Sequence, residues 1–114
     1  MIRRKADATT VERSMFGGPG LGHALQILNE GEFAAKGRLF NHVTLAPGCA
    51  VGKHTHHGEF EVYYILKGQG TYDDNGTECT VTAGDVTVCP DGESHGLLNS
   101  GSEDLEFIAL ILFQ

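Results

Sequence analysis

The fold is decided by the stretch GCAVGKHTHHGEFEVYYILKG, residues 48–68. Its second half, Phe60 to Leu66, is rich in aromatic and β-branched residues and ends at a glycine, which is typical of a β-strand. His54 and His56 precede it and are two residues apart, so on an extended chain both side chains leave the same face. Glu61 begins the second strand after a brief turn. The stretch therefore predicts two strands joined by a tight turn, with two imidazoles and one carboxylate near the junction.

Outward from this stretch, strand signals recur at short intervals. Leu39 to Leu45 alternates in polarity and stops at Pro47-Gly48, which predicts a strand and a turn. Asn75-Gly76 lies between two strand-like runs and predicts a β-hairpin. Leu105 to Phe113 reads as a long strand. Strands at this spacing predict an all-β fold, a sandwich or a small antiparallel β-barrel.

Two segments remain open at this stage. Ala24 to Leu28 fits either a strand or a helical turn, and residues 1–15 fit either an N-terminal arm or a covering strand. The basic residues Arg3, Arg4 and Lys5 are interpreted as a solvated tail. The whole chain, residues 1–114, is expected to form a single domain, because 114 residues leave little room for a second one.

Composition narrows the classes of function. A net charge of −7 argues against nucleic acid binding, which needs a lysine- and arginine-rich surface. The longest apolar run, residues 107–113, is too short to cross a bilayer, so no membrane partner is expected. No secretory signal is recognised, and the three cysteines match no zinc-knuckle spacing. Reduced thiols in a cytoplasmic protein are therefore expected.

His95 adds a third imidazole from a distant part of the chain, after the turn at Pro90-Asp91-Gly92. A lone His-x-His pair on a strand is more often incidental than a metal site. Antiparallel neighbours lie about 5 Å apart and metal–ligand bonds measure roughly 2.0–2.2 Å, so side chains from adjoining strands can converge on one ion. The interpretation as a metal site depends on the spacings of His54, His56, Glu61 and His95 taken together.

In these spacings the chain resembles the cupins. Their first motif, G-x5-H-x-H-x(3,4)-E-x6-G, is matched from Gly48 to Gly68, and their second, G-x5-P-x-G-x2-H-x3-N, from Gly84 to Asn99. All ten specified positions match in order, and the 15 residues between the motifs resemble the spacer of small single-domain cupins. The resemblance implies a jelly-roll barrel with His54, His56, Glu61 and His95 as metal ligands.

Three imidazoles and one carboxylate suit a divalent transition metal (Mn, Fe, Ni, Co or Zn), without selecting one of them. Four protein ligands leave about two positions open on an octahedral ion, where a small molecule, for example a carboxylate, binds through two oxygens. Two functions follow. The first is a small-molecule metalloenzyme, a dioxygenase, decarboxylase or isomerase. The alternative is a non-catalytic module that binds or senses a small ligand or a metal.

Four further expectations concern neighbouring features. Tyr63 shares the face of Glu61 by strand alternation and is interpreted mainly as a core or rim aromatic. His57 is expected at the surface or behind the ligands, and Cys89 as a small core residue near the site. The C-terminal strand is apolar on both faces from Phe107 onward, which predicts cover from a second subunit and hence a homodimer.

Overall fold

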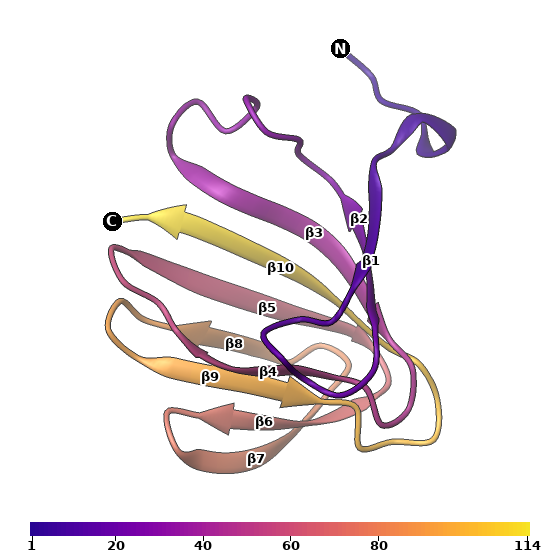
Figure 1. The fold of residues 1–114 in the computed structure, drawn as a ribbon, viewed down its shortest axis with the longest axis vertical. Helices are drawn as coiled ribbons and strands as arrows, with labels where there is room; N and C mark the ends of the chain where they lie inside the picture. Colours follow the sequence, from indigo (N-terminus) through magenta and orange to yellow (C-terminus); the bar gives the residue numbers. More distant parts are fainter.

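Ten strands form two antiparallel sheets that face each other (Figure 1), which confirms the predicted all-β class. The computed structural model describes residues 1–114, and its one helical element is a short 3-10 turn, Lys5–Asp7. The larger sheet has six strands in the order β1 (Thr10–Arg13), β2 (Gly22–Gln26), β3 (Gly37–Leu45), β10 (Leu105–Phe113), β5 (Glu59–Lys67) and β8 (Val86–Cys89). The smaller has four, in the order β4 (Ala50–Thr55), β9 (Ser94–Leu98), β6 (Gln69–Asp74) and β7 (Thr77–Thr82).

The hairpin predicted at Asn75-Gly76 is present and joins β6 to β7. Asp74 pairs with Thr77 across a two-residue turn. Asn75 and Gly76 both have positive φ, 49° and 103°, which is the backbone that a tight hairpin turn requires. The predicted strands at residues 39–45 and 105–113 correspond to β3 and β10. The open segment at residues 24–28 is strand β2, which ends at Gln26.

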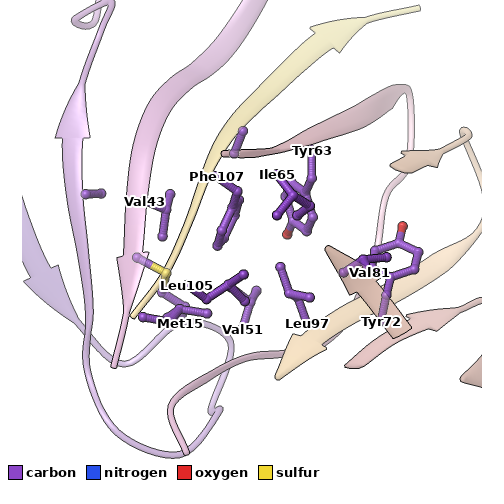
Figure 2. Packing of buried hydrophobic residues seen from close by; sticks show 13 residues of the cluster. Met15, Val43, Val51, Tyr63, Ile65, Tyr72, Val81, Leu97, Leu105 and Phe107 are labelled. Carbon is purple, nitrogen blue, oxygen red and sulfur yellow. The ribbon is translucent and has the colours of Figure 1, made fainter. Parts of the chain in front are cut away.

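The core lies between the two sheets, as Figure 2 shows. Both sheets contribute buried apolar side chains to the core. Examples are Val43, Ile65 and Phe107 from the larger sheet and Val51 and Leu97 from the smaller. In the larger sheet, β3, β5 and β10 alternate buried with more exposed residues over most of their length, because only one face of the sheet is turned inward.

Register places the inward-facing side chains of the larger sheet in rows across β3, β10, β5 and β8. The middle row contains Asn41, Ala109, Tyr63 and Thr87, all of them buried. The row toward one end contains Leu39, Ile111, Glu61 and Cys89. The row on the other side contains Val43, Phe107 and Ile65. Glu61 is thus a charged group at one end of an otherwise largely apolar interior.

The N-terminal segment ties the two sheets together. After β1 pairs with β2, the chain crosses to the smaller sheet, where Met15 forms a parallel bridge with Val51. The Gly52 amide donates to the Met15 carbonyl at 2.9 Å. Residues 1–15 were expected to form either an N-terminal arm or a covering strand. A strand is present over Thr10–Arg13. In Figure 1 this segment is the dark loop that passes over β4.

The interpretation of the basic N-terminus as a solvated tail is wrong for Arg3. Its guanidinium forms an ion pair with Glu32, and the Arg3 side chain is only 16% exposed. The sequence did not reveal this partner, because Glu32 lies 29 residues away in the loop between β2 and β3. Arg4 and Lys5 are exposed, as expected.

Candidate metal centre

The four predicted ligands converge at one point inside the barrel. His54 comes from β4, His56 from the turn after it, Glu61 from β5 and His95 from β9. His54 and His95 are direct partners across the β4–β9 ladder, which explains how residues 41 positions apart meet. The Nε2 atoms of the three imidazoles lie 3.1 Å from one another. The Oε1 atom of Glu61 lies 2.8 Å from His95 Nε2, 3.0 Å from His56 Nε2 and 3.4 Å from His54 Nε2.

Hydrogen bonds on the far side of two rings fix which nitrogen points inward. His54 Nδ1 lies 2.8 Å from the Gly52 carbonyl, and His56 Nδ1 lies 2.6 Å from the Glu59 carboxylate. Both partners are acceptors, so each Nδ1 carries the hydrogen and donates it. In a neutral imidazole the other nitrogen, Nε2, then presents a lone pair. Two lone pairs therefore face each other at 3.1 Å, an arrangement that a shared cation stabilises.

The third ring is held by Tyr72. Its hydroxyl lies 2.8 Å from His95 Nδ1, and the Tyr63 ring stacks on the His95 ring with centroids 4.9 Å apart. Phe16, from the crossing N-terminal segment, stacks on His54 at a centroid distance of 3.8 Å and an interplanar angle of 8°. The orientation of both rings is therefore set by packing as well as by hydrogen bonds.

Glu59 and Arg38 belong to the site and were missed by the sequence analysis. The Glu59 carboxylate accepts from His56 Nδ1, and Arg38 donates two hydrogen bonds to the same carboxylate, at 2.7 and 2.8 Å. The signal available in the sequence was parity, because Glu59 and Glu61 leave the same face of β5. Arg38, on β3, carried no such signal.

The charges of the cluster favour a bound cation. Burial would raise the pKa of the Glu61 carboxyl, but the imidazoles of His54, His56 and His95, whose Nε2 atoms lie within 3.4 Å of its Oε1 atom, outweigh burial and hold that pKa well below its ordinary value. The adjacent Glu61 carboxylate raises the pKa of His56 in spite of burial, and the hydrogen bond to Glu59 adds to the effect. Burial lowers the pKa of His95. Glu61 is thus an ionised carboxylate surrounded by imidazole nitrogen atoms. This negative charge attracts a cation to the cluster.

The donor set fits a divalent transition metal. Two ligand atoms bound to one ion at roughly 2.0–2.2 Å lie about 3 Å apart when they subtend a right angle, and somewhat farther apart at a tetrahedral angle. All six donor–donor distances in the cluster, from 2.8 to 3.4 Å, agree with this. Nitrogen and carboxylate donors suit Mn, Fe, Co, Ni or Zn and lack the thiolate that a soft ion prefers.

A cavity of about 260 Å³ opens beside Glu61. Eight of its twelve lining residues are hydrophobic, among them Leu39, Val43 and Phe107. Arg13, Ser14 and Phe16, from the N-terminal crossing, also line it and are exposed, so they mark its mouth. Of the four clustered donors, only Glu61 lines this cavity. A small ligand in the cavity therefore approaches the cluster from the side of Glu61.

The remaining residues of interest fall outside the cluster. His57 is exposed in the turn between β4 and β5. Tyr63 is buried, as a core aromatic, and also lines the cavity. Burial and the charge of Glu61 raise the pKa of the Cys89 thiol to about 11, so Cys89 is an unreactive core residue.

Comparison with known proteins agrees with the geometry. Residues 41–111, more than half of the chain, match the model of the cupin domain. This chain belongs to the cupin family. The match includes all four clustered donors, so the ligands expected from the family pattern and those brought together by the fold are the same residues.

Two findings place this cupin among small members of the family. It is 43% identical over 113 residues to the oxalate-binding protein of Thermotoga maritima, covering 98% of this chain and 93% of that protein. It superposes with a TM-score of 0.93 and 42% identity on the crystal structure of a predicted oxalate decarboxylase from Thermotoga maritima, with full coverage of both chains. A sugar phosphate isomerase from Silicibacter pomeroyi, at 17% identity and a TM-score of 0.78, shares the fold over all of this chain and 76% of its own.

The structure contains no helix with both the length and the apolarity needed to cross a bilayer. All three cysteines are free thiols.

Proposed function

We propose that this cupin binds one divalent transition metal through His54, His56, Glu61 and His95 and uses it to bind a small carboxylate. The observation that carries the proposal is the convergence of the four donor atoms within 3.4 Å of one another. When bound, the ion supplies a positive charge and open positions for ligand oxygens. The oxalate-binding relative, at 43% identity, supports a carboxylate as the ligand class.

The distribution of charge on the protein supports the binding of an anionic ligand in the cavity beside the metal centre and not elsewhere. The chain carries a net charge of −7, which repels anions at long range. Arg13 at the mouth is the one cationic side chain among the residues that line the cavity. A carboxylate therefore finds its positive partners at the metal centre and at Arg13, and nowhere else along the cavity.

A second candidate function, a metalloenzyme that acts on the bound carboxylate, rests on Tyr63. Besides Glu61 and Arg13, Tyr63 is the only titratable side chain that lines the cavity. Burial, with a contribution from the charge of Glu61, raises the pKa of its hydroxyl, so Tyr63 keeps its proton at neutral pH. It is thus suited to donate a hydrogen bond or a proton to a bound ligand and not to act as a base. A dioxygenase, a decarboxylase or an isomerase needs a group of this kind in addition to the ion.

Binding and turnover are tested together. The protein is loaded with Mn²⁺, Fe²⁺, Co²⁺, Ni²⁺ or Zn²⁺, and oxalate is titrated in by calorimetry. We expect saturable binding to the loaded protein and none to the metal-free protein; binding of equal strength to both would contradict the proposal. Oxygen uptake and carbon dioxide release are then followed. Turnover that Tyr63→Phe abolishes without loss of oxalate binding supports the enzyme, and binding without turnover supports the binding module.

We also propose a homodimer, formed through the outer face of the larger sheet. Tyr64, Leu66, Val86 and Val88 lie on neighbouring strands of this face and are 41–60% exposed. A contiguous apolar surface of this kind is typical of a protein–protein interface. Sedimentation velocity is expected to give twice the monomer mass, and Val88→Glu is expected to shift it to the monomer. A wild-type monomer at all concentrations would contradict this proposal.

Two further assignments are proposals of the same kind. Residues 1–114 form one domain, which is supported by the single buried cluster shared by both sheets and by the full coverage of the Thermotoga structure. The compartment is the cytoplasm, which is supported by the three free thiols.

A further inference from the structure

The three imidazoles of the metal centre are not held in the same way. The partners of His54 Nδ1 and His56 Nδ1, a carbonyl and a carboxylate, can only accept a hydrogen bond, so both nitrogens carry the hydrogen. The partner of His95 Nδ1 is the Tyr72 hydroxyl, 2.8 Å away, and a hydroxyl donates as well as accepts. The contacts of the His95 ring alone therefore do not select its tautomer.

The two tautomers of His95 differ in whether the Nε2 atom can bind an ion. When Tyr72 donates to Nδ1, the hydrogen of the neutral ring is on Nε2, which lies 2.8 Å from the Glu61 carboxylate and donates to it. This tautomer has no lone pair for a metal. When His95 donates from Nδ1 to the Tyr72 oxygen, Nε2 presents its lone pair, as in the other two ligands. Metal binding thus requires that the Tyr72 hydroxyl find another acceptor for its own hydrogen.

Thr87 supplies such an acceptor. It lies on β8 opposite Tyr63, faces the interior and is 7% exposed, and its Oγ1 atom is buried without a hydrogen-bond partner. Tyr72 and Thr87 come from opposite sheets and line the same cavity of about 280 Å³. Burial raises the pKa of the Tyr72 hydroxyl and the Thr87 side chain counteracts this, so the two hydroxyl groups are neighbours.

The unpaired Thr87 hydroxyl is unfavourable unless it gains a partner. A buried polar group without a hydrogen bond loses the free energy of its contact with water. Water does not restore that contact here, because the Oγ1 atom is shielded from solvent. A hydrogen bond donated by Tyr72 to Thr87 removes the loss, and it leaves the Tyr72 oxygen as the acceptor for His95. One change in hydrogen bonding thus satisfies Thr87 and selects the tautomer that binds metal.

We propose that Thr87 is a positioning residue of the metal centre, which accepts a hydrogen bond from Tyr72 and thereby makes the Tyr72 oxygen the acceptor for His95 Nδ1. The inference rests on the proposed function, because it concerns the metal that the four donors bind. Neither Tyr72 nor Thr87 lines the cavity beside Glu61, so both act through His95 and not by contact with a ligand in that cavity.

Thr87→Val tests the inference, because valine has the shape of threonine and lacks the hydroxyl. In competition with a chromogenic chelator, we expect Thr87→Val to bind Zn²⁺ about three- to tenfold more weakly than the wild type, the contribution of one hydrogen bond. Thr87→Ser keeps the hydroxyl and is expected to bind Zn²⁺ like the wild type. Thr80→Val, at an exposed position on β7, is the matched control and is expected to do the same.

The outcomes separate this inference from the proposed function. Unchanged Zn²⁺ affinity in Thr87→Val, with binding by the wild type, would overturn the inference and leave the proposed function intact. Failure of the wild type to bind Zn²⁺, Mn²⁺ or Ni²⁺ would overturn the proposed function and this inference with it. Urea unfolding of the metal-free proteins serves as a check on folding. Thr87→Val is expected to be no less stable than the wild type, because it removes a hydroxyl that has no partner.

A double variant shows whether Thr87 acts through Tyr72. Tyr72→Phe removes the acceptor of His95 Nδ1 and is expected to weaken Zn²⁺ binding at least as much as Thr87→Val. In the Tyr72→Phe background, Thr87→Val is expected to cause no further loss, because the hydrogen bond between the two residues is already absent. Losses that simply add in the double variant would contradict this path.

The tautomer of His95 is read directly in the wild-type protein by NMR of ¹⁵N-labelled histidines, a measurement that depends on no variant. Ring nitrogens with and without hydrogen differ clearly in ¹⁵N chemical shift. Addition of Zn²⁺ is expected to move the hydrogen of His95 from Nε2 to Nδ1, while His54 and His56 carry theirs on Nδ1 in both states. A His95 ring with its hydrogen on Nδ1 both with and without Zn²⁺ would leave no tautomer for Thr87 to select and would overturn the inference.

Discussion

Glu59 accepts a hydrogen bond from His56 Nδ1 at 2.6 Å and stands directly behind the ring that faces the metal centre. Arg38 clamps the same carboxylate with two further hydrogen bonds. This chain of contacts fixes the tautomer and the orientation of His56, because its Nδ1 proton has an ionised acceptor. A ligand held in this way is a better electron donor at Nε2.

Glu59→Gln is therefore expected to weaken metal binding about 10- to 100-fold without abolishing it. Loss of the carboxylate charge removes both the strong acceptor for His56 and the partner of Arg38. Competition with a chromogenic chelator measures the effect. Glu78→Gln, on the exposed strand β7, is the matched control and is expected to bind metal like the wild type. Equal affinities of Glu59→Gln and the control would show that the hydrogen bond does not tune the site.

His54→Ala and His95→Ala are expected to lower the metal content sharply, because each removes one of four donors that lie within 3.4 Å of one another. Elemental analysis after purification and dialysis measures the content. His57→Ala, exposed in the adjoining turn, controls for loss of any nearby imidazole. Full occupancy in both ligand variants would refute the assignment of the site.

Metal loading is expected to raise the melting temperature, since an ion that binds only the folded protein stabilises it. At a free metal concentration of about 100 times Kd the gain is about 2.7 kcal/mol, or roughly 10 °C for a chain of this size. Differential scanning calorimetry with and without chelator checks this. An unchanged transition at saturating Mn²⁺, Ni²⁺ and Zn²⁺ would count against metal binding.

Gly52→Ala is expected to destabilise both the N-terminal crossing and the metal centre. A Cβ atom at residue 52 would lie 2.2 Å from the Phe16 carbonyl oxygen, so the segment that carries Phe16 has to move. The Gly52 carbonyl also holds His54 Nδ1, and Phe16 stacks on the same ring. We expect a loss of about 1–3 kcal/mol in the free energy of unfolding and weaker metal binding.

Chemical denaturation and chelator competition measure these two effects. Gly101→Ala is the matched control, because a Cβ atom there meets its nearest neighbour at 3.3 Å, a contact that small adjustments accommodate. If Gly52→Ala behaves like Gly101→Ala in both assays, the close crossing does not support the site.

The ion pair between Arg3 and Glu32 predicts an acid-dependent loss of stability. A hydrogen bond from the Asn29 amide, together with Arg3, lowers the pKa of the Glu32 carboxyl below its ordinary value of 4.5. A carboxyl whose pKa is lower in the folded state stabilises the fold above the unfolded pKa. This stability is lost as the pH falls through the folded pKa. Glu32→Gln is therefore expected to be less stable than the wild type at neutral pH, and the difference is expected to vanish in acid.

Unfolding by urea at a series of pH values from about 6 down to about 3 follows this difference. A difference between the wild type and Glu32→Gln that persists unchanged into acid would show that the carboxylate charge plays no part. Glu103→Gln, at an exposed position, is expected to follow the wild type throughout.

Several strands could be predicted from local patterns, whereas the candidate ligands followed from the spacings within two separate motifs and from their resemblance to the cupins. His54 and His56 are two residues apart, and Asn75-Gly76 sits between alternating runs, so short-range geometry alone predicted a shared face and a hairpin. Arg38 and Tyr72 were not predicted, because their contacts with Glu59 and His95 depend on how distant strands pack, whereas Glu59 lies only three residues from His56 and its parity with Glu61 was overlooked. Arg38, for example, reaches Glu59 from β3, 21 residues away.

The sequence by itself determined much of the strand pattern, because side-chain direction along a strand follows from a period of two, and the spacings of its two motifs, through their resemblance to the cupins, implied the four donor residues. Only the tertiary structure decided what surrounds them. The facing of the two sheets created the cavity, the crossing of the N-terminal segment placed Phe16 on His54, and register set Asn41 in one row with Tyr63. These relations depend on how separate strands align and pack, and no local pattern of residues encodes that alignment.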